Sequence, residues 1–294
     1  MARAPRHLEL AGVFASSITP RRTNSQDPDF SGMLDLLDFL AAGGVNGVCL
    51  LDAAGEFLNC TFPERQRLVY LGVKRSRVPV IVGVSHSTLA GSIQLAAEAI
   101  ASGADALILM PPYFFRYSQR EIEEFYVEFA RETGDAVPLL IHNLPQATSK
   151  LELDLMRKLI DTGRYGGILD SSGDCPFFDQ LLELRQTRPF ALFNGDDRTA
   201  LRALRAGASG VVSGSACAVP ELLEGLARTL DDRLHARLIE FLEWADRFPF
   251  PAAIKRAVEL RGQKSAPPLT PLAPETRQAL IEFSTWFTGW VKHA

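Results

Sequence analysis

The sequence predicts a (β/α)8 barrel, because eight short apolar runs alternate with longer segments of helical period. The runs are apolar along their whole length rather than at every second residue, which is typical of parallel strands covered on both faces. An open, doubly wound sheet is the structural alternative for the same alternation. The expected strands are 12–18, 47–51, 78–84, 105–110, 137–142, 165–169, 190–193 and 210–213.

The segments between these runs carry signals for the starts and ends of helices. Residues 30–42 are amphipathic, and residues 63–73 begin with a proline, which the first turn of a helix accepts. Segments 118–131 and 149–160 each open with a serine followed three residues later by a glutamate, the pattern of a capping box. Glycines able to close helix ends follow several segments: Gly43, Gly103, Gly134, Gly163 and Gly207.

After Pro220 the chain contains no further strand-like run. Four segments there have helical period: 221–230, 233–247, 252–262 and 274–291. The first of them completes the barrel, so we expect a barrel domain at 1–230 and a C-terminal helical extension at 231–294, packed on the barrel. The proline-rich stretch 265–274 is too short to link independent domains.

The composition is that of an ordinary globular chain, with 294 residues, 47% of them hydrophobic, and a net charge of −4. This balance gives no electrostatic reason to expect nucleic acid as a partner. The apolar runs are too short and too interrupted to cross a bilayer, so we expect no membrane partner. The cysteines are far apart without a CxxC pair, and the N-terminus lacks the apolar stretch of a secretory signal, so we expect a cytoplasmic protein.

Active sites of such barrels lie at the carboxyl ends of the strands, so the residues after each run are the functional candidates. Fragments at these ends resemble, in order, the motifs of the dihydrodipicolinate synthase / N-acetylneuraminate lyase family. The fragments are SSITP (16–20), AAGE (53–56), PPYF (111–114), HNLP (142–145), GILDSSGD (167–174), GDD (195–197) and GVVSGSACAVP (210–220). Beyond the strands, PAAIK (251–255) resembles the family's C-terminal helix.

The resemblance covers nearly the whole chain. It implies a barrel lyase that forms a Schiff base between a lysine and a small 2-oxo acid such as pyruvate. It also implies no cofactor and no metal, and assembly as a homotetramer or homodimer.

The residues that perform this chemistry in the family differ here. Leu169 stands where the resemblance places the Schiff-base lysine, and a leucine has no nitrogen to form an imine. His142 takes the place of the proton-relaying tyrosine, and Ala147 that of an arginine that holds a substrate carboxylate. Ala53 and Ala54 replace two threonines. The sequence therefore predicts a family member that is not a dihydrodipicolinate synthase.

We expect His142 to do the acid/base work, because imidazole titrates near neutral pH and its position belongs to a proton relay in the family. Alternatively, its ring is satisfied by a neighbouring backbone group. Asp52 either faces His142 or is a solvated loop carboxylate. His86 is a rim candidate, and a metal site made of these side chains with Asp196 lacks any local ligand motif.

The remaining pocket residues are expected from the resemblance. Backbone N–H groups after the second strand remain able to hold a small carboxylate without the lost hydroxyls. The expected substrate-binding residues are Ala53, Ala54, Tyr113, Leu169, Gly195 and Val212.

Three functions remain open at this stage. The first is a divergent enzyme that moves a proton through His142, together with Asp52, on a small oxo or hydroxy acid. The second is a non-catalytic or regulatory protein that binds a small carboxylate. The third is an imine lyase with a relocated lysine, for which Lys150 is the candidate because it is the one lysine expected near the catalytic face.

Overall fold

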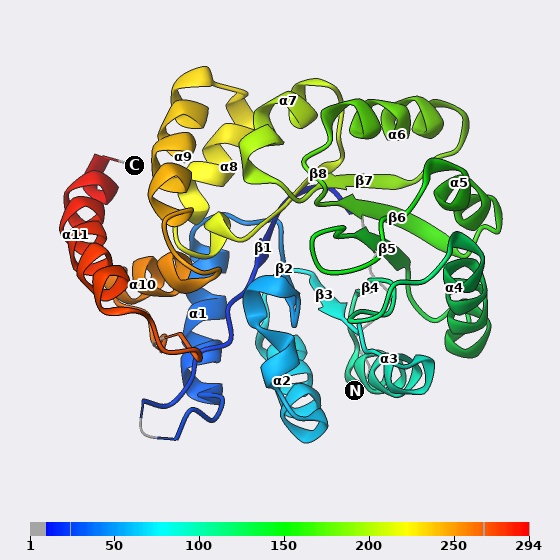
Figure 1. The fold of residues 1–294 in the computed structure, drawn as a ribbon, viewed down its shortest axis with the longest axis horizontal. Coiled ribbons are helices and arrows are strands. Elements are labelled where there is room, and N and C mark those ends of the chain that lie inside the picture. The colour runs from blue at the N-terminus through cyan, green and yellow to red at the C-terminus, as the bar shows by residue number, and fades with distance from the viewer. Residues whose placement is uncertain (1–9, 24, 267, 294) are drawn as a thin grey trace.

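The computed structural model describes residues 10–23, 25–266 and 268–293 and confirms the barrel. Eight parallel strands pair in chain order and β8 closes back on β1, which excludes the open sheet (Figure 1). The strands are β1 (Gly12–Ser16), β2 (Gly47–Leu50), β3 (Val80–Gly83), β4 (Ala106–Leu109), β5 (Leu139–Asn143), β6 (Tyr165–Asp170), β7 (Ala191–Asn194) and β8 (Gly210–Ser213). All of them lie within or within one residue of the predicted runs.

Helices surround the barrel on its outside, as Figure 1 shows. They are α1 (Phe30–Ala42), α2 (Phe62–Arg75), α3 (Leu89–Ser102), α4 (Gln119–Thr133), α5 (Leu153–Asp161), α6 (Cys175–Thr187), α7 (Ala200–Arg205) and α8 (Pro220–Thr229). Short 3₁₀ turns follow some strands, among them η1 (Ala53–Gly55) and η2 (Phe57–Asn59) after β2. These turns hold the chain at the mouth of the barrel.

One of the two predicted capping boxes is correct and the other is wrong. The Ser118 hydroxyl accepts from the N–H of Glu121 at the start of α4, and the Glu121 carboxylate accepts from the N–H of Ser118. At the second site, α5 begins only at Leu153. There the Ser149 hydroxyl accepts from the backbone N–H of Tyr117 at 2.9 Å, so it ties two loops together instead of capping a helix.

Apolar side chains fill the interior of the barrel. Phe14 of β1 and Phe193 of β7 pack edge to face at its centre, with ring centroids 5.4 Å apart. Their neighbours are Cys49, Ile81, Ala106, Ile108, Leu140, Leu169 and Val212. Because this layer closes the barrel floor, a ligand can enter only above it, at the carboxyl ends of the strands.

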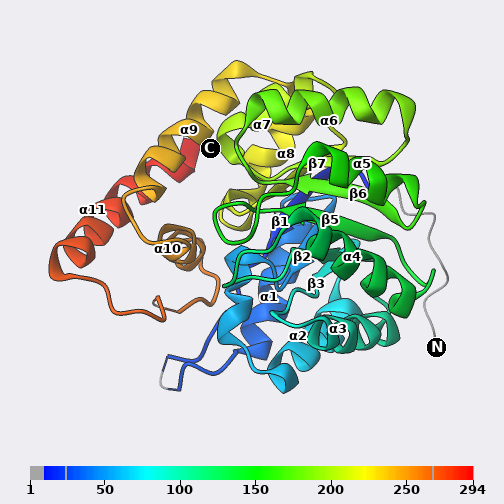
Figure 2. The ribbon, with the colours of Figure 1, turned by 45° about the vertical axis from the view of Figure 1, so that its right-hand side comes forward.

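The C-terminal helical extension consists of α9 (Asp232–Ala245), α10 (Ala252–Leu260) and α11 (Pro274–Trp290). Figure 2 shows α10 between the other two helices and the barrel mouth. The rings of α9 and α11 pack in one aromatic cluster formed by Phe241, Trp244, Phe283, Trp286, Phe287 and Trp290. None of the described helices is long and apolar enough to cross a membrane.

Candidate active site

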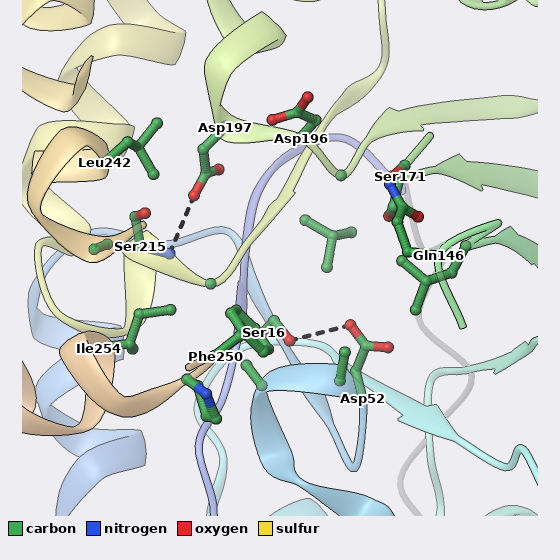
Figure 3. A pocket seen from close by; sticks show the side chains of 18 of the residues that line it. Ser16, Asp52, Gln146, Ser171, Asp196, Asp197, Ser215, Leu242, Phe250 and Ile254 are labelled. Carbon is green, nitrogen blue, oxygen red and sulfur yellow. Dashed lines mark hydrogen bonds between the residues drawn. The ribbon is translucent and has the colours of Figure 1, made fainter. Parts of the chain in front are cut away.

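A cavity of about 740 Å³ opens at the carboxyl ends of the strands. One wall comes from the ends of β1, β2, β5, β6, β7 and β8, and the other from α9, α10 and the segment between them. Figure 3 shows Ser171 and Gln146 across the cavity from Leu242 and Ile254. The barrel wall therefore contributes polar side chains beside apolar ones such as Leu169 and Val212, whereas the wall made by the C-terminal helices is largely apolar.

His142 lies near the carboxyl end of β5, and only 2% of its surface is exposed. Its Nδ1 lies 3.4 Å from Oδ1 of Asp52, and its Nε2 lies 3.0 Å from the Ser171 hydroxyl. These contacts place one carboxylate and one hydroxyl on the two nitrogens of the same ring. Both polar contacts of His142 are thus made with side chains, and not with a neighbouring backbone group, which was the alternative predicted from the sequence.

Asp52 follows β2 and is buried beside His142. Burial alone raises the pKa of a carboxyl group, but here the charge and hydrogen bond of His142 outweigh it, with help from the Ala53 N–H and the Ser16 hydroxyl. The net effect holds the pKa of Asp52 below its usual range. Ser16 Oγ donates to Oδ2 of Asp52 at 3.1 Å, as drawn in Figure 3. Asp52 is therefore ionised at neutral pH.

The Asp52 carboxylate determines which ring nitrogen of His142 carries the proton. A carboxylate accepts hydrogen bonds and cannot donate one, so whenever the ring of His142 is neutral its hydrogen stays on Nδ1, the nitrogen that faces Asp52. Nε2 is then an acceptor, and the Ser171 hydroxyl donates to it. The result is a basic nitrogen directed at a hydroxyl that lines the cavity.

From the sequence, Ser171 is one of the residues that follow the sixth expected strand, but no role was predicted for it. A usable signal was present, because Ser171 lies two residues beyond Leu169 and alternation along an extended strand directs both side chains to the same face. Gly195 makes room for it, since a Cβ at that position would lie 2.0 Å from the Ser171 hydroxyl oxygen.

The intervening residue, Asp170, points to the opposite side of the strand. Its carboxylate accepts from Asn143 Nδ2 at 2.7 Å and from the Ser172 hydroxyl at 2.8 Å. Burial raises the pKa of Asp170, and these donors only partly offset that effect. Asp170 therefore holds two strand ends together and does not reach the cavity.

Most of the other predicted pocket residues do line the cavity. They are Ala53, Ala54, Leu169, Gly195 and Val212. The Ala53 N–H, however, already donates to the Asp52 carboxylate, so it is not open to a ligand. Tyr113 lies outside the cavity lining, with its ring packed edge-on against Phe57 at 5.8 Å.

His86 also lies away from the cavity. Its ring packs against Phe62 at 5.1 Å, and its Nδ1 contacts the Thr88 hydroxyl. Burial and the nearby charge of Arg65 lower the pKa of His86. The described part of the chain holds no group of three or more His, Cys, Asp or Glu side chains placed to bind a metal.

No lysine lines the cavity among the described residues. Lys150 is half exposed and pairs with Asp174 at 3.3 Å on the outer surface. Lys255 is buried to 1% exposure, and its Nζ lies 2.8 Å from the Glu56 carboxylate. This buried pair joins α10 to the turn that follows Asp52. It could not be predicted from the sequence, because its two residues are 199 positions apart in the chain.

Acidic side chains dominate the charged lining of the cavity. Asp197 accepts from the Ser215 N–H at 3.2 Å, and burial raises its pKa. Arg198 is the one arginine among the described lining residues, and it is ion-paired with Asp246. Among the described lining residues there is thus no unengaged guanidinium or ammonium group for an anionic ligand.

Comparisons with known proteins agree on one family. A sequence model described as the dihydrodipicolinate synthetase family matches residues 9–286. The 4-hydroxy-tetrahydrodipicolinate synthase of Methanothrix thermoacetophila is 30% identical over 272 residues, covering 90% of this chain and 91% of the relative. The enzyme of the same name from Phenylobacterium zucineum is 30% identical over 286 residues, covering 92% of this chain and 94% of the relative.

Solved structures show the same fold. YagE from E. coli K12, a prophage protein of the dihydrodipicolinic acid synthase family in complex with pyruvate, superposes with a TM-score of 0.87 at 23% identity, over 96% of this chain and 98% of that one. Dihydrodipicolinate synthase from Aquifex aeolicus superposes with a TM-score of 0.84 at 24% identity, over 94% of this chain and 97% of that one.

Proposed function

This chain belongs to the dihydrodipicolinate synthetase family, and from that premise we propose a lyase-type enzyme that transfers protons through His142 without a lysine imine. The observation that carries the proposal is the buried contact of His142 with Asp52 at the base of the cavity. The absence of any lysine from the described cavity lining supports it further. Leu169, which stands where the resemblance to the family places the imine lysine, presents only a hydrocarbon side chain to the cavity.

The proposed chemistry follows from the tautomer of His142. Asp52 holds the Nδ1 hydrogen and stabilises the imidazolium that forms when Nε2 accepts a proton. The substrate is a small oxo or hydroxy acid, as the family membership suggests, and the proton comes from the carbon next to its carbonyl or carboxyl group, whose oxygen takes up the electron pair. Such positioned general-base catalysis contributes about 10²–10⁴-fold to a rate.

Borohydride trapping tests the lysine-independent part of the proposal. We expect no mass increase when the protein is treated with borohydride and a panel of 2-oxo acids including pyruvate. Leu169→Lys is the matched positive control, because it places an amine in the cavity at the position where the resemblance expects the imine lysine. An adduct on the unmodified protein, mapped to Lys150 or another lysine, would show that the imine has moved.

Deuterium exchange tests the role of His142. We expect the protein to exchange the carbon-bound hydrogen of at least one small oxo or hydroxy acid, offered both as the free acid and as its methyl ester, in D₂O, detected by proton NMR. His142→Asn should abolish the exchange while the thermal melt stays cooperative. Thermal stabilisation by such an acid without exchange would instead favour a binding or regulatory protein.

The proposal includes a homo-oligomer, either a dimer or a tetramer. Large apolar side chains exposed near the barrel mouth support it, since Phe114, Phe115 and Leu58 are 86%, 65% and 60% exposed. Light scattering in solution measures the state directly, and a monomer at micromolar concentration would contradict this part.

A further inference from the structure

We propose that Ser171 is a nucleophile, and that Asp52, His142 and Ser171 together hydrolyse a small neutral ester or lactone bound in the cavity. The inference rests on the proposed role of His142 as a base, but not on proton abstraction from carbon. It names the form in which an oxo or hydroxy acid would enter the cavity, namely as its ester or lactone.

The three side chains lie in the order that nucleophilic catalysis by serine requires. The nucleophile must contact the base, and the base must be oriented by a third group on its other nitrogen. Here Ser171 Oγ lies 3.0 Å from His142 Nε2, and Asp52 Oδ1 lies 3.4 Å from His142 Nδ1. The three residues come from the ends of β6, β5 and β2, so the closed barrel brings them together.

Ser171 is also accessible to a ligand. Its side chain lines the cavity, whereas His142 behind it is almost fully buried. Gln146 lines the same space, and its Nε2 donates to the Ser171 carbonyl at 3.1 Å. A primary amide has a second N–H, so we assign Gln146 to stabilise the negative oxygen that develops during attack.

The charges of the cavity favour a neutral substrate. Asp196, Asp197 and Asp246 contribute acidic groups, and Arg198 is already paired with Asp246. A free carboxylate would therefore meet like charges without an unengaged arginine or lysine to bind it. An ester avoids this repulsion, and its apolar part can lie against the wall formed by α9 and α10.

The proposed reaction has two balanced steps. The Ser171 oxygen attacks the acyl carbon as its proton passes to His142 Nε2, the carbon–oxygen bond to the alcohol breaks, and the leaving oxygen takes that proton. Water then attacks the acyl carbon and gives a proton to His142, the bond to Ser171 breaks, and the serine oxygen recovers that proton. The products are the acid and the alcohol, which remain one molecule when the substrate is a lactone.

An alkyl fluorophosphonate probe tests the nucleophile directly. We expect one phosphonyl adduct on the peptide that contains Ser171, and no adduct in Ser171→Ala. Ser172→Ala, which removes the neighbouring hydroxyl that donates to Asp170 outside the cavity lining, should be labelled as fast as the unmodified protein. His142→Asn should slow labelling at least about 100-fold.

A second measurement does not depend on the probe reaching the site. Ser171→Cys places a thiol against His142, so iodoacetamide should alkylate Cys at this position at pH 6–7, below the usual thiol pKa of about 8.5. Adding His142→Asn should return the alkylation to the pH dependence of an ordinary thiol. Peptide mapping separates this thiol from the native cysteines.

The outcomes separate this inference from the proposed function. No adduct on Ser171, or labelling and alkylation that are indifferent to His142, overturns the nucleophile. If deuterium exchange still depends on His142 in that case, the proposed function survives. If the adduct forms and p-nitrophenyl acetate gives a burst that Ser171→Ala abolishes, while no oxo acid exchanges, the nucleophile stands and the carbon-acid reaction fails.

Discussion

Replacing Lys255 by methionine should destabilise the fold by about 3–5 kcal/mol, the cost of leaving one partner of a buried ion pair unmatched. The side chains of Lys255 and Glu56 are 1% and 11% exposed, and Nζ lies 2.8 Å from the carboxylate. Methionine keeps most of the apolar stem of the lysine but removes the charge. The Glu56 carboxylate is then left in a site from which water is largely excluded.

Chemical unfolding followed by circular dichroism measures this loss. For a chain of this size each kcal/mol corresponds to a Tm change of about 2–4 °C, so Lys255→Met should lower Tm by roughly 6–20 °C. Lys150→Met is the matched control, because its partner Asp174 is 3.3 Å away and both side chains are 40% or more exposed. That exposed pair should contribute less than about 1 kcal/mol.

A double variant identifies the cause. Adding Glu56→Gln to Lys255→Met removes the orphaned charge, so the double variant should recover part of the stability lost in the single one. If Lys255→Met costs no more than Lys150→Met, the buried pair does not stabilise the fold and Lys255 needs another role. Loss of oxo-acid exchange at unchanged stability would point to such a role in catalysis.

Three further substitutions test the raised pKa of Asp197 and the packing around two glycines, Gly210 and Gly289. Burial raises the pKa of Asp197, so the folded state keeps this proton to a higher pH than the unfolded state does, and stability falls as pH rises above about 4. Asp197→Asn should therefore be more stable than the unmodified protein at pH 7 and lose that advantage below about pH 4 in pH-dependent thermal melts. Gly210→Ala should cost at least about 1–3 kcal/mol in chemical unfolding, because its Cβ would lie 1.9 Å from the backbone oxygen of Gly12. A Cβ at Gly289, inside α11, would have no heavy atom within 4 Å. Gly289→Ala should therefore raise the free energy of unfolding by about 0.4–1 kcal/mol in the same measurement. Equal effects at the two glycines would contradict the packing argument.

The strand ends predicted much of the candidate site. Asp52 and His142 were identified because parallel strands bring their carboxyl ends to one face of a barrel, and the structure places them 3.4 Å apart. Tyr113 was expected in the pocket by resemblance alone and lies outside its lining. No role was predicted for Ser171, although alternation from Leu169 directs it inward, because the contact that suggests its role is with His142 on another strand.

The sequence by itself determined the barrel, since the order of apolar runs and helical segments is a local property that each segment carries in its own side chains. It also determined which side chains stand at the mouth, because strand ends follow from that order. Only the tertiary structure decided what those side chains contact. The pairing of His142 with Ser171, and of Lys255 with Glu56, joins residues 29 and 199 positions apart. Such contacts depend on how the barrel closes and on where α10 packs against its mouth. Local periodicity in the sequence predicts neither of these.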